Sequence, residues 1–201
     1  MQKRMFRDRF GLTDLVLSGH KTQTRDVIKI QDKRLDYLRG WNLDGGFAEF
    51  GRDGEEPLRL YPKYYVGEVV AVAMRYKTIY ERVVKTREYI EEIKRKYRKV
   101  KGWTNKMYVK PDSMPFTIKI TKIRFERLQD ICDEDCMKEG IEKMLVGGEY
   151  HLYSFLDKKK YEWTDFRTPQ EAFAALIDKI NGKGTWASNP YVWAYDFELV
   201  K

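Results

Sequence analysis

The chain has 201 residues, of which 42% are hydrophobic and 14% aromatic, enough to bury the core of one domain spanning residues 1–201. It holds no apolar run of about 18 residues, so we expect no membrane-spanning segment. It has only two cysteines, which argues against a disulfide scaffold and predicts a reducing compartment, the cytoplasm.

The formal net charge of +8 is unevenly distributed. Residues 82–106 contain ten Lys/Arg and three Glu, a balance of +7, so the rest of the chain carries only +1. A cationic segment on a near-neutral body is typical of an arm that contacts a polyanion. The same pattern also fits the solvated face of a helix, and composition alone leaves both interpretations open.

The first predicted element is a short helix from Leu12 to Ser18, with Thr13 as a candidate N-cap and Gly19 just past its end. A polar loop at 19–25 then leads into an extended stretch at 26–30.

Three further stretches complete the first half of the chain. Residues 40–67 are rich in glycine and aromatic side chains, which indicates loops or a hairpin. Residues 69–80 alternate and are β-branched, which predicts a strand. Residues 81–100 carry a narrow apolar stripe on a charged background, which predicts a helix.

Residues 116–125 return to strand, but their apolar side chains change parity between Ile120 and Ile123. We therefore expect a β-bulge near Thr121 and Lys122. Residues 133–139 then predict a short helix that ends at Gly140.

Residues 168–171 (Thr-Pro-Gln-Glu) form a capping box with proline at the first helical position, which predicts a helix start. Residues 192–200 alternate cleanly and predict a final strand. Strands separated by helices of unequal length, without a regular βαβ rhythm, favour an α+β fold with a partly closed sheet.

Four patches of sequence resemble the ASCH domains, relatives of the PUA domains, and above all their phage and prophage members. The first is similar to a G-x-K-x-x-T-x-R loop and the second to a Gly-Asp/Glu strand start; the four are residues 19–25, 67–72, 127–141 and 186–193. The resemblance implies a PUA-like, partly closed β-barrel with flanking helices, whose loop lines a cleft, and with an inserted basic helix at about 81–104.

Such domains are proposed to bind RNA, and some small bacterial members are amidohydrolases that deacetylate N4-acetylcytidine. In that branch a lysine and a threonine of the loop, matched here by Lys21 and Thr24, work with a glutamate on the next strand. Counting from Gly67, the glutamate position falls on Met74. The nearest carboxylates are those of Glu68 and Glu81.

The missing carboxylate matters for the chemistry. A threonine hydroxyl is a weak nucleophile without a neighbouring base. A lysine acts as that base only when burial or nearby cations lower its pKa. A carboxylate would orient the lysine and shuttle the proton, and the side chain of Met74 does neither. We therefore rank binding ahead of catalysis.

The candidate ligand site combines cationic and polar side chains, which supply several donors to a phosphate or a base edge: Lys21, Thr24, Arg25, Lys106 and Asn189. Cations of the basic segment are the candidate contacts to a nucleic-acid backbone: Lys94, Arg95, Arg98 and Lys99. Each of these side chains also has a structural alternative, a surface ion pair for Arg25 and a turn for Asn189.

No metal or cofactor is expected. Cys132 and Cys136 are four residues apart, but no second Cys/His pair completes a tetrahedral site, and His20 and His151 stand alone. Small buried side chains are the alternative role for the cysteines.

Four aromatic residues of the 40–67 stretch either stack on unpaired bases or fill the core: Trp41, Tyr61, Tyr64 and Tyr65.

Three functions follow from these observations. The first is an RNA- or nucleoside-binding module. The second is an amidohydrolase acting on an acylated pyrimidine nucleoside, using Lys21 and Thr24. The third is a non-catalytic accessory phage or prophage protein whose basic helix binds a protein partner.

Overall fold

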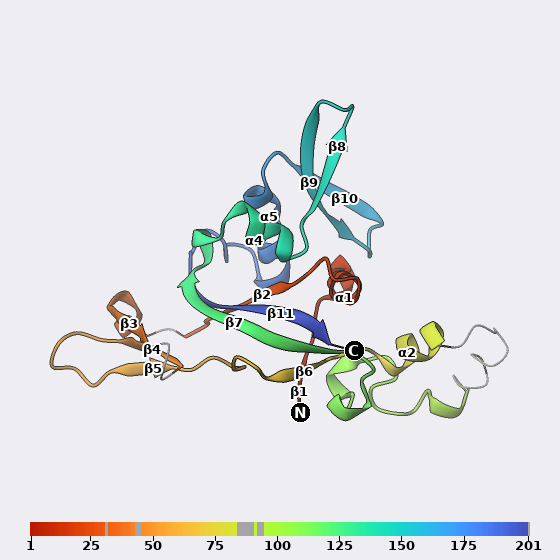
Figure 1. The fold of residues 1–201 in the computed structure, drawn as a ribbon, viewed down its shortest axis with the longest axis horizontal. Helices are drawn as coiled ribbons and strands as arrows, with labels where there is room; N and C mark the ends of the chain where they lie inside the picture. Colours follow the sequence, from red (N-terminus) through yellow and green to blue (C-terminus); the bar gives the residue numbers. More distant parts are fainter. Residues whose placement is uncertain (31, 43–45, 84–90, 92–94, 201) are drawn as a thin grey trace.

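The computed structural model describes residues 1–30, 32–42, 46–83, 91 and 95–200 (Figure 1). Its strands are β1 (Gln2–Arg4), β2 (Gln23–Val27), β3 (Leu38–Asn42), β4 (Phe47–Phe50), β5 (Leu58–Leu60), β6 (Val69–Val72), β7 (Thr117–Arg127), β8 (Glu142–Val146), β9 (Tyr150–Asp157), β10 (Glu162–Phe166) and β11 (Tyr191–Val200). Its helices are α1 (Leu12–Leu17), α2 (Tyr76–Val83), α4 (Asp133–Lys138) and α5 (Pro169–Asn181). Short 3-10 turns are η1 (Asp8–Phe10), η2 (Lys33–Asp36), η3 (Lys106–Tyr108), η4 (Pro111–Ser113) and η5 (Leu128–Asp130).

A five-stranded central sheet organises the fold, in the order β1-β6-β7-β11-β2. Its β1–β6 pair is parallel and its other pairs are antiparallel. Two three-stranded antiparallel sheets, β3-β4-β5 and β10-β9-β8, project from it as separate arms, and α2 lies in a third (Figure 1). The expected α+β class is confirmed.

Side chains connect the two edge strands of the central sheet. Arg4 on β1 donates from Nη1 to Asp26 Oδ2 (2.6 Å) and from Nη2 to Thr24 Oγ1 (2.9 Å), both on β2. Tyr64 and Tyr195 pack edge to face in the same space, with their centroids 5.4 Å apart. The sheet is therefore strongly curved, and within the described residues its edges are joined by side chains.

The expected β-bulge is confirmed on β7. Lys122 pairs with Asp196 and Ile120 pairs with Phe197, so Thr121 is the extra residue. The bulge explains why the apolar side chains of β7 change parity there.

The expected helix start at 168–171 is also confirmed. Thr168 Oγ1 accepts from the backbone N–H of Glu171, whose side chain accepts from the N–H of Thr168. For α1 the expected N-cap is wrong, because Gly11, with φ of +67°, occupies that position. Thr13 is the second residue of α1, and its hydroxyl donates to Asp8 Oδ1 at 2.6 Å.

The strand expected at 69–80 is wrong in its second half, because β6 ends at Val72 and α2 begins at Tyr76. Tyr76, Ile79 and Tyr80 fit a helical i, i+3, i+4 spacing as well as a mixed alternation, so the short pattern was ambiguous. The helix expected at 81–100 thus starts earlier. Its residues 84–90 and 92–94 lie outside the described part of the chain.

The sheet β10-β9-β8 was not anticipated. It attaches through Phe155 of β9, which is buried and contacts the ring of Phe10 edge to face at 5.9 Å. Among the described residues, no helix has the length and apolar character needed to cross a bilayer. The cytoplasmic location stays a prediction.

Candidate functional site

Strand β2 divides the predicted site residues between two faces of the central sheet. Thr24 is paired with Tyr195 and Arg25 with Ala194. Since successive side chains of a strand point to opposite faces, Thr24 and Arg25 point away from each other. The structure brings Arg25 together with Lys21, and places Thr24 elsewhere.

This division exposes a departure from the G-x-K-x-x-T-x-R pattern. In that pattern the arginine follows the threonine by two residues, which puts both side chains on one face of a strand. In this chain Asp26 occupies that position and Arg25 stands one residue earlier. The guanidinium beside Thr24 comes instead from Arg4, on β1.

The face that carries Arg25 holds a set of interlocking ion pairs under α4. Lys21 Nζ lies 2.6 Å from Glu139 Oε2 and also donates to the Glu139 carbonyl at 2.6 Å. Arg25 pairs with Glu139 Oε1 at 3.1 Å and with Glu126 Oε1 at 2.7 Å. We call this group the charged cluster, and its members are Lys21, Arg25, Arg124, Glu126, Asp135, Lys138, Glu139 and Asp196.

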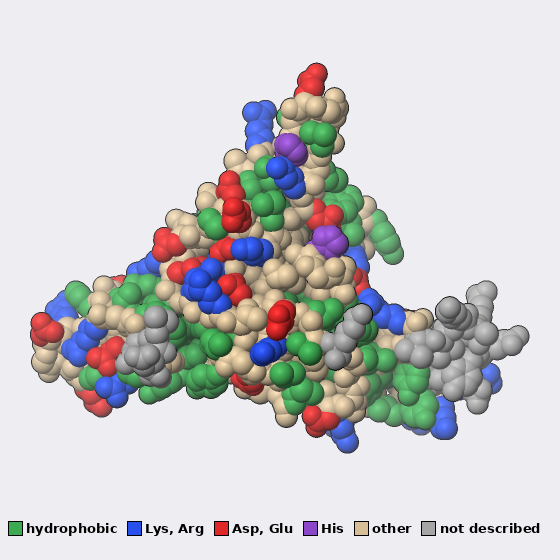
Figure 2. All heavy atoms as spheres, in the orientation of Figure 1, with side chains coloured by type: hydrophobic (Ala, Val, Ile, Leu, Met, Phe, Trp, Pro, Cys, Tyr) green, Lys and Arg blue, Asp and Glu red, His purple; other side chains and the backbone are tan. Residues whose placement is uncertain are grey.

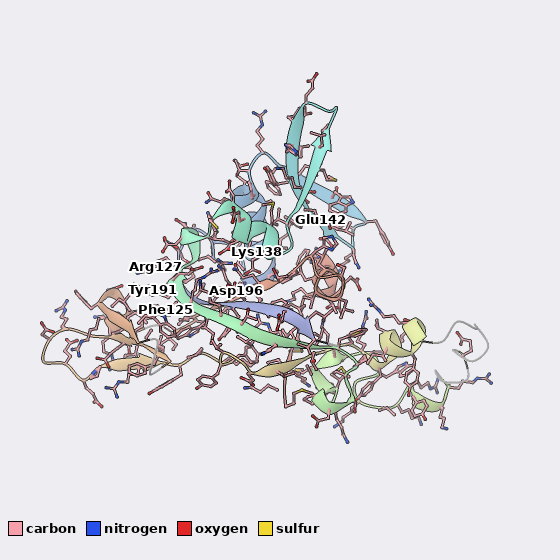
Figure 3. The ribbon with its side chains drawn as sticks, viewed as in Figure 1. Phe125, Arg127, Lys138, Glu142, Tyr191 and Asp196 are labelled. Atoms are coloured by element: carbon pink, nitrogen blue, oxygen red, sulfur yellow. The ribbon has the colours of Figure 1, made fainter. Side chains whose placement is uncertain are left out.

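The outer members of the charged cluster reach the surface. Arg124 Nη2 lies 2.7 Å from Asp135 Oδ2 and 3.6 Å from Asp196 Oδ1, and Lys138 Nζ lies 3.2 Å from Asp135 Oδ1. Figure 2 shows acidic and basic side chains intermixed on this face, and Figure 3 places Lys138 and Asp196 near each other below α4. The cluster contains four basic and four acidic side chains, so their formal charges cancel.

Burial lowers the pKa of Lys21 below its usual value; Glu139 opposes that effect, and Arg4 and Arg25 add to it. A lowered pKa is what a lysine general base needs. However, Lys21 is only 2% exposed and Thr24 Oγ1 already accepts a hydrogen bond from Arg4. Among the described residues, Lys21, Thr24 and Arg25 line none of the cavities of about 290, 110 and 300 Å³. The geometry does not assemble a nucleophile with its base.

The other predicted ligand residues lie apart from β2. Lys106 Nζ lies 2.7 Å from Asp8 Oδ1 and 3.3 Å from Thr13 Oγ1. Asn189 has φ of +40°, and its Oδ1 accepts from the backbone N–H of Gln129 at 2.9 Å. Asn189 therefore shapes a turn, and Lys106 belongs to the surroundings of η1.

The predicted backbone contacts fall at the end of the basic segment. Arg95, Arg98 and Lys99 are described and exposed. Lys94 lies outside the described residues.

The cysteines are free thiols: Cys132 is exposed and Cys136 is buried. Burial raises the pKa of Cys136 to about 12, so this thiol is unreactive near neutral pH. In the portion of the chain that the structure describes, no three His, Cys, Asp or Glu side chains are placed to hold a metal ion.

A cavity of about 300 Å³ opens on the other face of β2. Its lining combines rings with charged groups: Asp26, Lys29, Arg59, Tyr61, Lys63 and Trp193. Of the four aromatic residues considered for stacking, Tyr61 lines this cavity, while Tyr64 is buried and Trp41 packs on Trp193 at 4.9 Å. Tyr65 is exposed.

A second cavity, of about 290 Å³, lies between α2 and the basic segment, and we call it the aromatic groove. The ring of Tyr97 is nearly parallel to that of Tyr80 (centroids 6.0 Å apart, 16°) and to that of Trp103 (6.4 Å, 24°). Lys96 Nζ lies 5.4 Å from the Tyr97 ring centroid. Its full lining is Tyr76, Ile79, Tyr80, Tyr97, Val100, Trp103 and Ser113.

Sequence reasoning found the cations of this region and missed its rings. The detectable sign was a set of aromatic residues at 76 and 80, just before the basic segment, and at 97 and 103, within it. Their convergence depends on how α2 packs, which the local pattern does not contain.

Comparisons of the chain with protein-family models, with curated proteins and with solved structures find no match. The resemblance to the ASCH domains therefore stays a prediction.

Proposed function

We propose that this protein binds single-stranded RNA in the aromatic groove, with the neighbouring cations contacting the phosphates. The observation that carries the proposal is the position of Tyr97. Its ring lies in the groove, and it belongs to the stretch 95–101, which has five Lys/Arg and no acidic residue. Stacking surface and positive charge thus occur in one place.

The physical basis is the way unpaired nucleic acid binds to proteins. A base stacked on an aromatic side chain contributes about 1–3 kcal/mol, and cations along the path hold the backbone. Arg95, Arg98 and Lys99 are exposed, which leaves their charge available to phosphates. By contrast, the charged cluster under α4 has equal numbers of acids and bases, so it offers a polyanion no net attraction.

The preference for RNA comes from the proposed kinship with ASCH domains and their PUA-like barrels. The curved central sheet supports that kinship, because Arg4 links its two edge strands across the open side. Residues 19–22 also lead directly into β2, an edge strand of that sheet, and residues 23–25 belong to the strand itself. The chain departs from the ASCH pattern at two positions. The arginine of the loop stands one residue early, at Arg25, and Met74 occupies the position of the strand glutamate.

The salt dependence of RNA affinity tests the cationic part of the proposal. Each phosphate contact on a single strand adds about −0.7 to the slope of log affinity against log salt. Arg95→Ala with Lys99→Ala should reduce the magnitude of that slope by about 1.4 if both contact phosphates. Fluorescence anisotropy of a labelled oligoribonucleotide, from low to moderate salt, measures it.

The matched control replaces Lys143 and Lys160, two exposed lysines of the β10-β9-β8 region, with alanine. It removes the same net charge at a distance from the groove and should leave the slope unchanged. A salt-independent affinity, or no binding at low salt, would refute the RNA proposal and favour the protein-binding alternative.

Tyr97→Leu tests the stacking part, since it removes the ring and keeps an apolar side chain. RNA affinity should fall about 5- to 150-fold, the range that corresponds to one lost stacking contact. The salt slope should stay that of the wild type, because no charge changes. Equal affinities for the variant and the wild type would show that the groove binds no base.

The amidohydrolase alternative rests on two observations, the contact of Lys21 with the Glu139 carboxylate and the lowered pKa of Lys21. The separation of Thr24 from that pair argues against it. We expect no measurable hydrolysis of N4-acetylcytidine. Robust turnover that is lost in both Lys21→Met and Glu139→Gln would reverse this ranking.

A further inference from the structure

Helix α2 presents two different faces. Tyr76, Ile79 and Tyr80 face the aromatic groove, whereas Thr78 and Arg82, together with Arg75 just before the helix, line a separate cavity of about 110 Å³. Met74 also lines this cavity, at the position where a glutamate was expected. Its remaining walls come from distant parts of the chain: Asp8, Thr13, Asp14 and Lys158.

The ion pairs around this cavity are unevenly shared. Asp14 pairs with two cations, Lys158 (2.5 Å from Nζ to Oδ2) and Arg82. Asp8 also pairs with two, Lys106 (2.7 Å from Nζ to Oδ1) and Arg75 (3.9 Å from Nε to Oδ2). Four cations therefore share two carboxylates, which leaves a formal excess of +2. Three of the cations line the cavity, and the fourth, Lys106, lies next to it, in contact with Asp8 and Thr13.

An excess of +2 at a concave site attracts a dianion. Burial lowers the pKa of Lys106, Asp8 opposes this effect, and Arg75 and Arg7 reinforce it, which shows how closely the positive charges are crowded. The guanidinium groups of Arg75 and Arg82 suit the oxygens of a tetrahedral oxyanion, and the Thr78 hydroxyl adds a possible donor. A volume of about 110 Å³ holds about four water-sized groups, so it fits a phosphate and not a nucleoside.

We infer that this cavity binds a dianionic phosphate group, supplied either by the 5′ end of an RNA strand or by a free phosphate. Binding of an RNA 5′-phosphate rests on the proposed function, whereas binding of free phosphate does not. An α-helix with its side chains is about 10–12 Å across, so a strand stacked in the aromatic groove can pass over α2 and place its terminal phosphate here. The dianionic charge of a phosphate monoester, unlike a backbone diester, matches the excess of +2.

The first experiment titrates the full chain with inorganic phosphate by isothermal titration calorimetry. Wild type should bind it, and Arg82→Gln with Lys158→Gln should weaken binding about tenfold or more, because two charged donors are lost. Lys143→Gln with Lys160→Gln is the matched control and should bind phosphate as the wild type does. No binding by the wild type, or equal binding by both double variants, would overturn the inference.

A second variant changes the affinity in the opposite direction. Asp14→Asn raises the excess to +3 and frees the charges of Arg82 and Lys158, so phosphate affinity should increase by up to about fivefold. Unchanged or weaker binding would count against the site.

The second experiment separates the two sources of phosphate. It compares one oligoribonucleotide with a 5′-phosphate and with a 5′-hydroxyl, at the same salt concentration. If RNA supplies the group, the phosphorylated strand binds more tightly to the wild type, and Arg82→Gln with Lys158→Gln removes only that advantage. Equal RNA affinities together with phosphate binding assign the site to free phosphate. If neither strand binds while inorganic phosphate does, the proposed function fails and this inference stands.

Discussion

At the scale of single residues, Glu139 has the most consequential contacts in the charged cluster. Its carboxylate pairs with Lys21 at 2.6 Å and with Arg25 at 3.1 Å, and the side chain of Arg25 is fully buried. Two buried cations therefore share this carboxylate; Lys21 pairs with it alone among the described residues, whereas Arg25 also pairs with Glu126 and Asp135. Glu139 follows α4, far in sequence from the cations that it neutralises.

Removing that carboxylate should be costly. Glu139→Ala leaves Lys21 without its charged partner and removes one of the carboxylates that pair with Arg25. Breaking a buried ion pair in this way typically costs about 3–5 kcal/mol. Urea unfolding followed by circular dichroism measures the loss of free energy of unfolding. Glu49→Ala is the control, because the pair of Glu49 with Arg59 is exposed to solvent and should contribute far less to stability. Equal losses for the two variants would contradict the assigned role of Glu139.

At the scale of elements, the contact of α2 with the C-terminal end of the basic segment shapes the aromatic groove. The backbone N–H of Tyr76 donates to the Gly102 carbonyl at 3.1 Å, and Gly102 has φ of +95°. A Cβ on Gly102 would lie 2.8 Å from Cε2 of the Tyr76 ring and 3.2 Å from Val109 Cγ1. Only glycine allows this close approach.

Gly102→Ala should therefore destabilise the protein in two ways. A non-glycine residue at this positive φ costs about 1–3 kcal/mol, and the added Cβ clashes with the ring of Tyr76. Gly184→Ala is the matched control, since Gly184 has φ of +87° with no atom within 4 Å of the added Cβ. Thermal unfolding should show a larger loss for Gly102→Ala, and its RNA affinity should fall as the groove distorts. Identical unfolding temperatures would mean that the Tyr76 ring moves aside freely.

At the scale of the whole molecule, aromatic contacts and ion pairs attach the arms to the central sheet. Tyr191 stacks on Phe125 (centroids 4.9 Å apart, 19°), the Arg127 guanidinium lies 3.7 Å from the Tyr191 ring centroid, and Figure 3 shows the three together. Phe50 of β4 packs edge to face on Phe125 at 5.6 Å. This stack joins the β3-β4-β5 sheet to the bend of β7 and β11.

The β10-β9-β8 sheet is attached by a charged contact that depends on pH. Arg9 donates to Asp157 at the end of β9, and its hydrogen bonds are the main cause of an Asp157 pKa of about 2. A carboxyl group whose pKa is lowered on folding stabilises the protein at pH values above its pKa in the unfolded chain, about 3.9 for Asp. That stability is lost as the pH falls through about 4 towards 2.

Arg9→Met should accordingly lower the free energy of unfolding near neutral pH and flatten its decline between about pH 4 and pH 2. Urea unfolding at several pH values measures both effects. Arg52→Met serves as the control, because the Arg52 guanidinium donates to the Tyr37 hydroxyl and, among the described residues, to no carboxylate. A decline as steep in Arg9→Met as in the wild type would remove Asp157 from this account.

Several elements were determined by the sequence itself, because their causes are local. The capping box at 168–171, the alternation of β11 and the parity change that marks the Thr121 bulge all involve residues close in the chain. Where local periodicity was ambiguous, at 76–80, the sequence predicted a strand and packing produced a helix.

Only the tertiary structure decided the sites. The alternation of β2 sends Thr24 and Arg25 to opposite faces, and Glu139 reaches Lys21 through the packing of α4. The aromatic groove and the cavity lined by Thr78 and Arg82 likewise combine side chains from distant segments. An ion pair or a cavity depends on which segments meet in space, and a pattern of neighbouring residues does not contain that information.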